Sequence, residues 1–333
     1  MVDSSMMSLM MEMATFGFVI PIVFIAVWKL RMRKSLIPVL VGAGTFFVFA
    51  YILEAVPHTL FLQIQSPVSA FINGNVWVYA LYSGIMAALF EEFGRFVAFK
   101  YILKKHTERE TAVSYGLGHG GLECIIVLGL GHLQNFTYSQ LINNGEMDTI
   151  IESISDNPAA IKTYQSIVAS LTNLKLPEMI WGGAERIAML FLQVALSVMV
   201  YYAVREAGQI RFLWIAMAVH TLVDFVAAFY KSGMVPLFVV ELCIFIITIG
   251  ACRLAYQLYK KLPENNKEKT KKSNWQYATN RYKDMKNTSD DTETVKDSSK
   301  EKTKGSVQKE PMENTDDPSK QEISVEDESE DEG

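Results

Sequence analysis

The sequence predicts an all-α protein, a polytopic bundle of about seven transmembrane helices followed by a disordered, charged tail. Three observations support this fold class: long apolar runs, few charges within them, and a sharp change of composition near residue 264. Residues 264–333 contain 13 of the 31 Lys and Arg residues and 19 of the 36 Asp and Glu residues. The first 263 residues therefore keep only 18 basic and 17 acidic groups, too few for an ordinary soluble domain.

Seven apolar runs are long enough to cross a membrane, because a spanning helix needs roughly 20 mostly apolar residues. The alternative is six spans and one re-entrant segment near 111–134, where glycine is dense. The seven expected spans are 9–28, 36–56, 76–103, 111–134, 180–204, 211–230 and 235–258.

Basic residues between the spans predict the orientation in the membrane. The loops after the first, third, fifth and seventh spans carry Lys and Arg, whereas residues 57–75 contain neither. Because loops on the cytoplasmic side carry an excess of Lys and Arg, the N-terminus is expected outside and the C-terminus inside. We expect a multi-pass protein of the cell membrane, specifically of a bacterial plasma membrane.

The expected domains are a membrane domain at 1–263 and an acidic cytoplasmic tail at 264–333. The tail has almost no apolar residues to offset its chain entropy, and it could contact a cytoplasmic partner. The outer loop at about 135–179 shows apolar residues at helical spacing, which predicts short amphipathic helices at the membrane surface. No basic domain supports nucleic-acid binding, and three cysteines in apolar runs do not form a disulfide framework.

Charged residues within three of the spans indicate a buried site, since an ionisable group in a membrane is costly and usually functional. On each span, two of them are four residues apart and so lie on one face of the helix. Glu92 adds a further carboxylate next to the first pair. The pairs are Glu91 with Arg95, His119 with Glu123, and His220 with Asp224.

The three pairs are expected at a similar depth. Counted from the inner end of each span at 1.5 Å per residue, the Glu and His residues lie roughly 12–18 Å into the membrane. Side chains from three helices could therefore meet in the inner half of the bilayer.

Two imidazoles and a carboxylate form a hydrolytic zinc site that leaves one position for water. We expect His119, His220 and Glu123 as zinc ligands, with Asp224 as the alternative carboxylate. A further carboxylate, Glu91, can then act as general base. Asp224 or Glu123 could instead accept a hydrogen bond from an imidazole, and the HExxH spacing of soluble zinc peptidases is absent.

Other interpretations of the same residues stay open. Arg95 could form only a structural ion pair with Glu91, and the histidines could serve only helix packing. A second polar group is expected near the outer ends of the spans, with a structural role or, as the alternative, a role in substrate gating. It consists of Glu54, Glu185, Arg186 and Glu241.

The three motifs resemble those of a known superfamily. Glu91–Arg95 (EEFGR) resembles the paired-glutamate motif of the CAAX-protease and bacteriocin-processing superfamily, closest to its PrsW branch. His220–Asp224 (HTLVD) resembles the third motif of that superfamily, and His119–Glu123 (HGGLE) is similar to the YhfC family of intramembrane metalloproteases. The resemblance covers roughly residues 10–260.

The resemblance implies roles for individual residues. Glu91 and His119 would activate the attacking water with support from Glu92, and His220 with Asp224 would bind the metal or stabilise the oxyanion. The spacing E-E-x-x-R is one residue shorter than the E-E-x-x-x-R of the CAAX proteases. The chain also adds Glu123 after the histidine of the second motif, and these two departures leave metal ligation and metal-free glutamate catalysis as alternatives.

The function expected first is intramembrane proteolysis of a membrane protein or peptide in or near the inner leaflet, with zinc as cofactor. A second hypothesis is a non-catalytic membrane scaffold or immunity-type factor, because the same superfamily is similar to a scaffold subunit of gamma-secretase. A third is a proton-coupled transporter, although no inverted repeat is evident.

Overall fold

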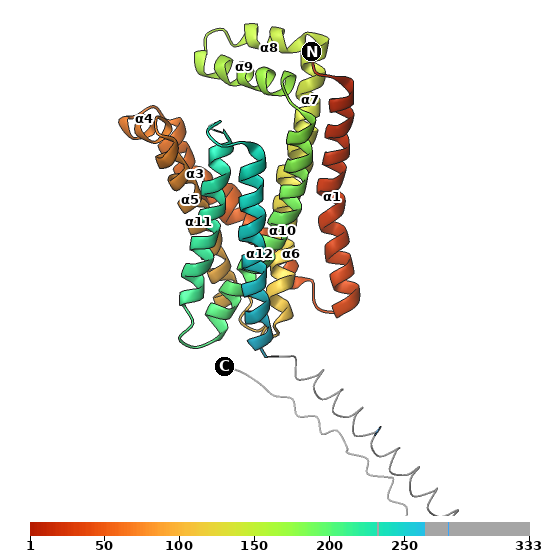
Figure 1. Ribbon diagram of the computed structural model, residues 1–333, viewed down its shortest axis with the longest axis vertical. Helices are drawn as coiled ribbons and strands as arrows, with labels where there is room; N and C mark the ends of the chain where they lie inside the picture. Colours follow the sequence, from red (N-terminus) through yellow and green to blue (C-terminus); the bar gives the residue numbers. More distant parts are fainter. Residues whose placement is uncertain (232, 264–278, 280–333) are drawn as a thin grey trace, which may run out of the picture. The chain divides into compact units, whose positions relative to one another are not determined.

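The computed structural model describes residues 1–231, 233–263 and 279, so the expected tail at 264–333 lies outside the described residues except for position 279. Every regular element in the described part is helical, as predicted (Figure 1). The elements are α1 Ser4–Met32, α2 Ile37–Thr45, η1 Phe46–Leu53, α3 Ala55–His58, η2 Thr59–Gln63, α4 Pro67–Asn73, α5 Val76–Val97, η3 Ala98–Ile102, α6 Glu110–Cys124, η4 Ile125–Leu130, α7 Gly131–Asn144, α8 Glu146–Ser153, α9 Pro158–Thr172, α10 Leu176–Arg205, α11 Arg211–Lys231 and α12 Leu237–Lys261.

Seven helical runs in the described residues are long and apolar enough to cross a membrane, as predicted. The second, third and fourth runs each join α-helical and π-helical (η) segments end to end. The fourth run is a continuous helix over Glu110–Asn143, so the alternative of a re-entrant segment near 111–134 is wrong. The runs are Ser4–Met32, Ile37–Gln63, Val76–Ile102, Glu110–Asn143, Leu176–Arg205, Arg211–Tyr230 and Leu237–Lys261.

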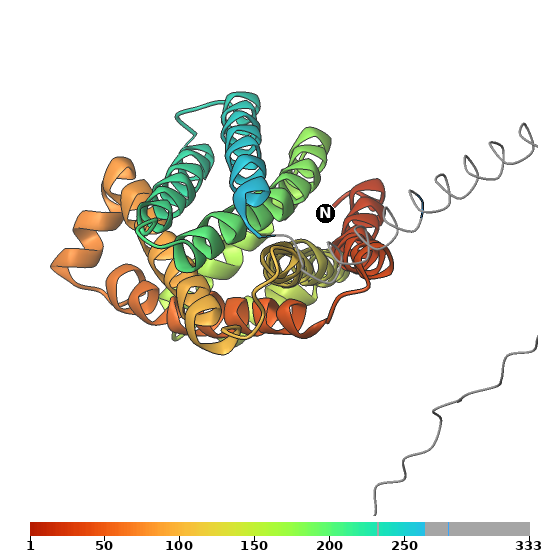
Figure 2. The same ribbon diagram turned by 90° about the horizontal axis from the view of Figure 1, so that it is seen from below.

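Helix α10 is the centre of the bundle (Figure 2). It packs against α6, α11 and α12, and its side chains form much of the main hydrophobic core. By contrast, α1 and α12 expose large apolar side chains such as Phe16, Ile22 and Ile249. An apolar surface of this extent is typical of a protein whose solvent is lipid.

The long loop is helical and packs on the start of the chain. Helices α8 and α9 lie at the end of the bundle where α1 begins (Figure 1). Val2, Met10, Leu171 and Met179 form a small separate core there. The side chain of Asn143 also accepts from the Val2 N–H (2.7 Å) and donates to the Val2 carbonyl oxygen (2.9 Å). The predicted helices within 135–179 are thus present.

Glycine contacts bring α6 close to α2 and so place His119. A Cβ on Gly118 would overlap the carbonyl oxygen of Val39, and a Cβ on Gly42 would overlap the carbonyl oxygen of Tyr115. Small residues at such interfaces let two helix backbones approach each other within a membrane. His119, which follows Gly118 on α6, is fully buried.

We expect Gly118→Ala to push α2 and α6 apart, because backbone atoms cannot rotate away from the new methyl group. Overpacking of this kind costs about 1–3 kcal/mol. The measurement is the midpoint of thermal unfolding in detergent. Gly44→Ala is the matched control, since a Cβ at Gly44 meets nothing within 4 Å. Equal midpoints for the two variants would contradict the close contact.

Candidate active site

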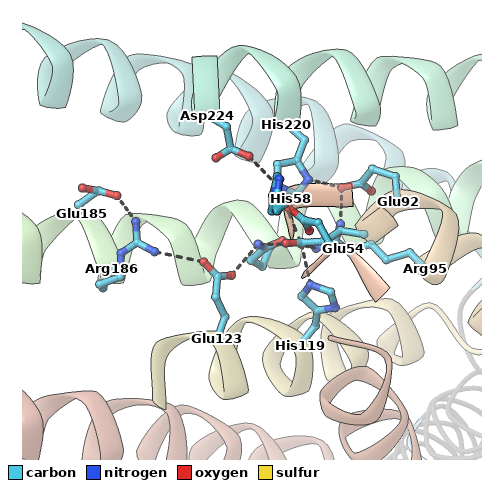
Figure 3. A network of polar contacts seen from close by, with 12 residues as sticks. Glu54, His58, Glu92, Arg95, His119, Glu123, Glu185, Arg186, His220 and Asp224 are labelled. Carbon is cyan, nitrogen blue, oxygen red and sulfur yellow. Dashed lines mark hydrogen bonds and ion pairs between the residues drawn. The ribbon is translucent and has the colours of Figure 1, made fainter. Parts of the chain in front are cut away.

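Polar side chains from four helices meet inside the bundle (Figure 3). Each helix presents them on one face at a spacing of three or four residues, as predicted for α5, α6 and α11. The fourth helix, α10, contributes an amide that the sequence motifs did not include. The residues are Glu91, Glu92 and Arg95 on α5, His119 and Glu123 on α6, Gln193 on α10, and His220 and Asp224 on α11.

Arg95 holds the two glutamates of α5 together. Its side chain is fully buried and forms ion pairs with Glu91 (3.2 Å) and with Glu92. It also donates to the side-chain oxygen of Gln193. A buried charge is stable only when it is paired and hydrogen-bonded, and here one guanidinium pairs with two carboxylates in an apolar setting.

The two histidines contact these carboxylates from opposite helices. His119 Nε2 lies 2.9 Å from Glu91 Oε2, and His220 Nδ1 lies 2.7 Å from Glu92 Oε1. His220 Nε2 lies 3.9 Å from Glu91 Oε2 and 3.5 Å from Asp224 Oδ2. The structure therefore brings together Glu91, Glu92, Arg95, His119, His220 and Asp224, all of them expected from the sequence.

Gln193 connects the two ends of the network. It is buried, and its amide nitrogen donates to Glu91 Oε2 (3.3 Å) and to Glu123 Oε2 (2.6 Å). A signal for it exists in the sequence, because an amide in the apolar run of α10 is itself unusual. Gln193 also follows Arg186 by seven residues, which places both on one face of the helix.

Glu123 lies in a different place from the one expected. Its carboxylate bonds to Gln193 and, at 3.2 Å, to Arg186 of α10, and no contact joins it to either histidine. Arg186 also pairs with Glu185. Arg186 and Glu185, which were expected in a separate outer polar group, are thus joined to the candidate site through Glu123, and this corrects the prediction for these two residues (Figure 3).

The residue types suit the zinc expected from the sequence, but their arrangement does not form a ligand set. Among the described residues, no group of three or more His, Cys, Asp or Glu side chains is placed to hold a metal ion. His119 and His220 both face Glu91 Oε2, and Arg95 lies at the same carboxylate. In this arrangement His119 Nε2 and His220 Nδ1 form hydrogen bonds with carboxylates, whereas a histidine that binds a metal must present the lone pair of a ring nitrogen to it.

Three buried polar atoms of the site keep their bonding capacity. His119 Nδ1, Glu92 Oε2 and Arg95 Nε have no hydrogen-bond partner within the described part of the chain. A buried polar atom without a partner is costly, and such atoms in native proteins often serve a function. They are the atoms of this cluster that a substrate could contact without displacing a protein group.

The fold and the site define a polytopic membrane protein with a buried Glu/His/Arg centre. A family model described as YhfC intramembrane metalloprotease matches residues 16–245, and the chain belongs to this family. The chain is also 31% identical over 221 residues to the uncharacterized membrane protein YhfC of Bacillus subtilis (strain 168). That alignment covers 66% of this chain and 83% of the relative. No solved structure matches the chain.

The family match confirms the resemblance drawn from the three motifs. The matched residues include every polar residue of the candidate site. They exclude the expected tail at 264–333.

We expect Gln193→Leu to destabilise the protein by about 1–3 kcal/mol, because it leaves the partners of Gln193 buried with one bond fewer. The leucine has a similar volume, so packing changes little. The measurement is the thermal midpoint in detergent. Ser197→Ala on the same helix is the control, since Ser197 Oγ bonds only the backbone oxygen of Gln193 (2.7 Å). A Gln193 variant as stable as this control would contradict the bridging role.

Proposed function

We propose that this membrane protein is an intramembrane peptidase that hydrolyses a peptide bond with Glu91 as general base. The observation that carries the proposal is the convergence of four helices on one carboxylate oxygen. Glu91 Oε2 lies 2.9 Å from His119, 3.2 Å from Arg95, 3.3 Å from Gln193 and 3.9 Å from His220. A carboxylate so surrounded is held in one position, as a general base must be. The family description, intramembrane metalloprotease, names the same reaction class.

The reaction follows from the chemistry of a carboxylate and a peptide carbonyl. A water oxygen attacks the carbonyl carbon while Glu91 takes one proton from the water. The tetrahedral intermediate then breaks its C–N bond, and Glu91 returns the proton to the departing amine. The products are a carboxylic acid and an amine, so atoms and charge balance.

The neighbours of Glu91 have separate tasks in this proposal. Arg95 pairs with both Glu91 and Glu92 and holds the carboxylate of Glu91 in place for the attack. His220 lies between Glu92 and Asp224, where it can donate a hydrogen bond to the oxyanion that forms on the substrate carbonyl. His119 orients the carboxylate of Glu91 from the opposite side.

Zinc stays a prediction, because the described donors are not placed as a ligand set. Its test is metal analysis of the dialysed protein together with His119→Ala and His220→Ala. Zinc in stoichiometric amount that is lost from both variants would confirm a site at these histidines. Zinc retained in full by both variants would exclude this placement. This measurement does not depend on finding a substrate.

A non-catalytic scaffold is the second candidate, favoured by one observation. Arg95 is fully buried and forms ion pairs with both glutamates, as a purely structural group of ion pairs would. The two functions differ in their dependence on the Glu91 charge. A scaffold tolerates a neutral isostere at position 91, whereas a general base does not.

We expect Glu91→Gln to abolish cleavage and leave the fold intact. Loss of a general base lowers the rate about 10²–10⁴-fold. Folding should persist because Glu92 still pairs with Arg95. The measurement uses the full chain in liposomes with a library of apolar single-span peptides, and mass spectrometry detects the fragments.

Glu12→Gln is the matched control for this experiment, since it neutralises an exposed carboxylate on α1 away from the site. It should cleave at the rate of the unaltered protein. Equal results for the unaltered protein and Glu91→Gln, whether both cleave or neither does, would contradict the proposal and favour the scaffold.

A further inference from the structure

A polar cavity lies beside the candidate active site, and we call it the Glu54 pocket. Its volume is about 290 Å³. Asp224 belongs to both places, because it lines the pocket and its Oδ2 lies 3.5 Å from His220 Nε2. The lining residues are Glu54 and His58, then Tyr79, Ser83 and Ala87 of α5, and Asp224, Ala227 and Ala228 of α11.

The pocket extends from the site toward the end of the bundle where α5 begins. Helices α5 and α11 are antiparallel, since Glu92 contacts His220 whereas Trp77 packs on Phe229. Moving from Ala87 back to Tyr79 therefore leads in one direction along the bundle, over about 12 Å. This direction leads toward the outer face of the membrane in the predicted orientation.

The pocket is acidic. Glu54 and Asp224 are carboxylates, and no Lys or Arg occurs among the described residues that line it. His58 Nε2 lies 3.0 Å from Glu54 Oε1, and His58 Nδ1 lies 3.4 Å from the hydroxyl of Tyr82. The ring thus holds Glu54 in place at the pocket wall. Carboxylates within a membrane-spanning region are costly unless a positive charge is near.

An organic cation suits this lining better than a metal ion does. The described residues contain no group of three His, Cys, Asp or Glu placed around a metal, and this includes the pocket. Its wall combines two carboxylates and the hydroxyls of Tyr79 and Ser83 with apolar surface from three alanines. A lysine or arginine side chain has matching parts, an apolar stem and a charged head that donates hydrogen bonds.

We propose that the Glu54 pocket binds the cationic side chain of a lysine or arginine in the peptide substrate. Because Asp224 lies beside His220, the bound lysine or arginine of the substrate would lie next to the scissile bond, on the side toward the start of α5. The inference rests on the proposed peptidase function and adds the substrate class. A basic residue near the outer end of an apolar segment is the feature that the pocket selects.

Binding is measured with the full chain carrying Glu91→Gln, so that the peptide stays uncut. The probes are apolar peptides with blocked ends that differ at one position, which is lysine, arginine or the uncharged norleucine. We expect the two basic peptides to bind about tenfold more tightly than the norleucine peptide, because a buried carboxylate gains a partner. Fluorescence anisotropy in detergent gives the dissociation constants.

Two pocket variants and one control locate the preference. Glu54→Gln and Asp224→Asn should each reduce the lysine preference several-fold, whereas Glu12→Gln on α1 should leave it unchanged. Thermal midpoints near that of the parent show that each variant is folded. Equal affinity for the lysine and norleucine peptides would overturn the proposal. A preference that survives in both pocket variants would overturn it as well.

Cleavage by the unaltered protein separates this inference from the function on which it rests. The lysine is moved along the peptide, and mass spectrometry reports where cleavage occurs. Cut sites that move with the lysine support the pocket as a substrate subsite. If the cut sites do not depend on the position of the lysine, the peptidase function is supported and the proposed subsite is overturned. If the protein binds the basic peptides selectively but cleaves none of them, the pocket is a cation-binding site and its proposed role in proteolysis is overturned.

Discussion

The ion pairs of Arg95 are the interaction on which the rest of the site depends. Arg95 and Glu92 are fully buried and Glu91 nearly so, and the bundle can hold these charges only because they are paired with one another. Removing one member of such a buried group typically costs about 3–5 kcal/mol. The packing of α10 and α11 against α5 then follows, since Gln193 and His220 complete the bonds of the same three side chains. Stability and chemistry are concentrated in one place.

Much of the architecture could be predicted because hydropathy and spacing along a single helix are properties of the sequence itself. The seven spans follow from apolar runs, and pairs such as His220 and Asp224 follow from the pitch of a helix. The common level of Glu91, His119 and His220 follows from counting residues along antiparallel spans. None of these predictions depends on which helices are neighbours in the bundle.

The lateral arrangement of the helices could not be obtained in this way. Glu123 was expected beside His119, one turn away on the same helix, but it turns to Arg186 and Gln193 because α10 packs closely against α6. The contact of His220 with Glu92, and the pocket between Glu54 and Asp224, likewise depend on which faces of α5 and α11 meet. Hydropathy predicts how deep a residue lies in the membrane but not which helix lies beside it. The residues of the polar cluster could therefore be predicted, whereas the hydrogen bonds and ion pairs between them could not.

The glycine contact between α2 and α6 also limits how the bundle can open. At Gly42 and Gly118 the two backbones touch with no side chain between them, so no rotamer change can widen that seam. Opening this seam would therefore require the two backbones themselves to separate. At the seam between α1 and α10, by contrast, the rings of Phe24 and Phe191 meet edge to face with centroids 5.7 Å apart. Side chains of this kind can change rotamer, so the contact between α1 and α10 can widen without movement of the backbone, whereas the contact between α2 and α6 cannot.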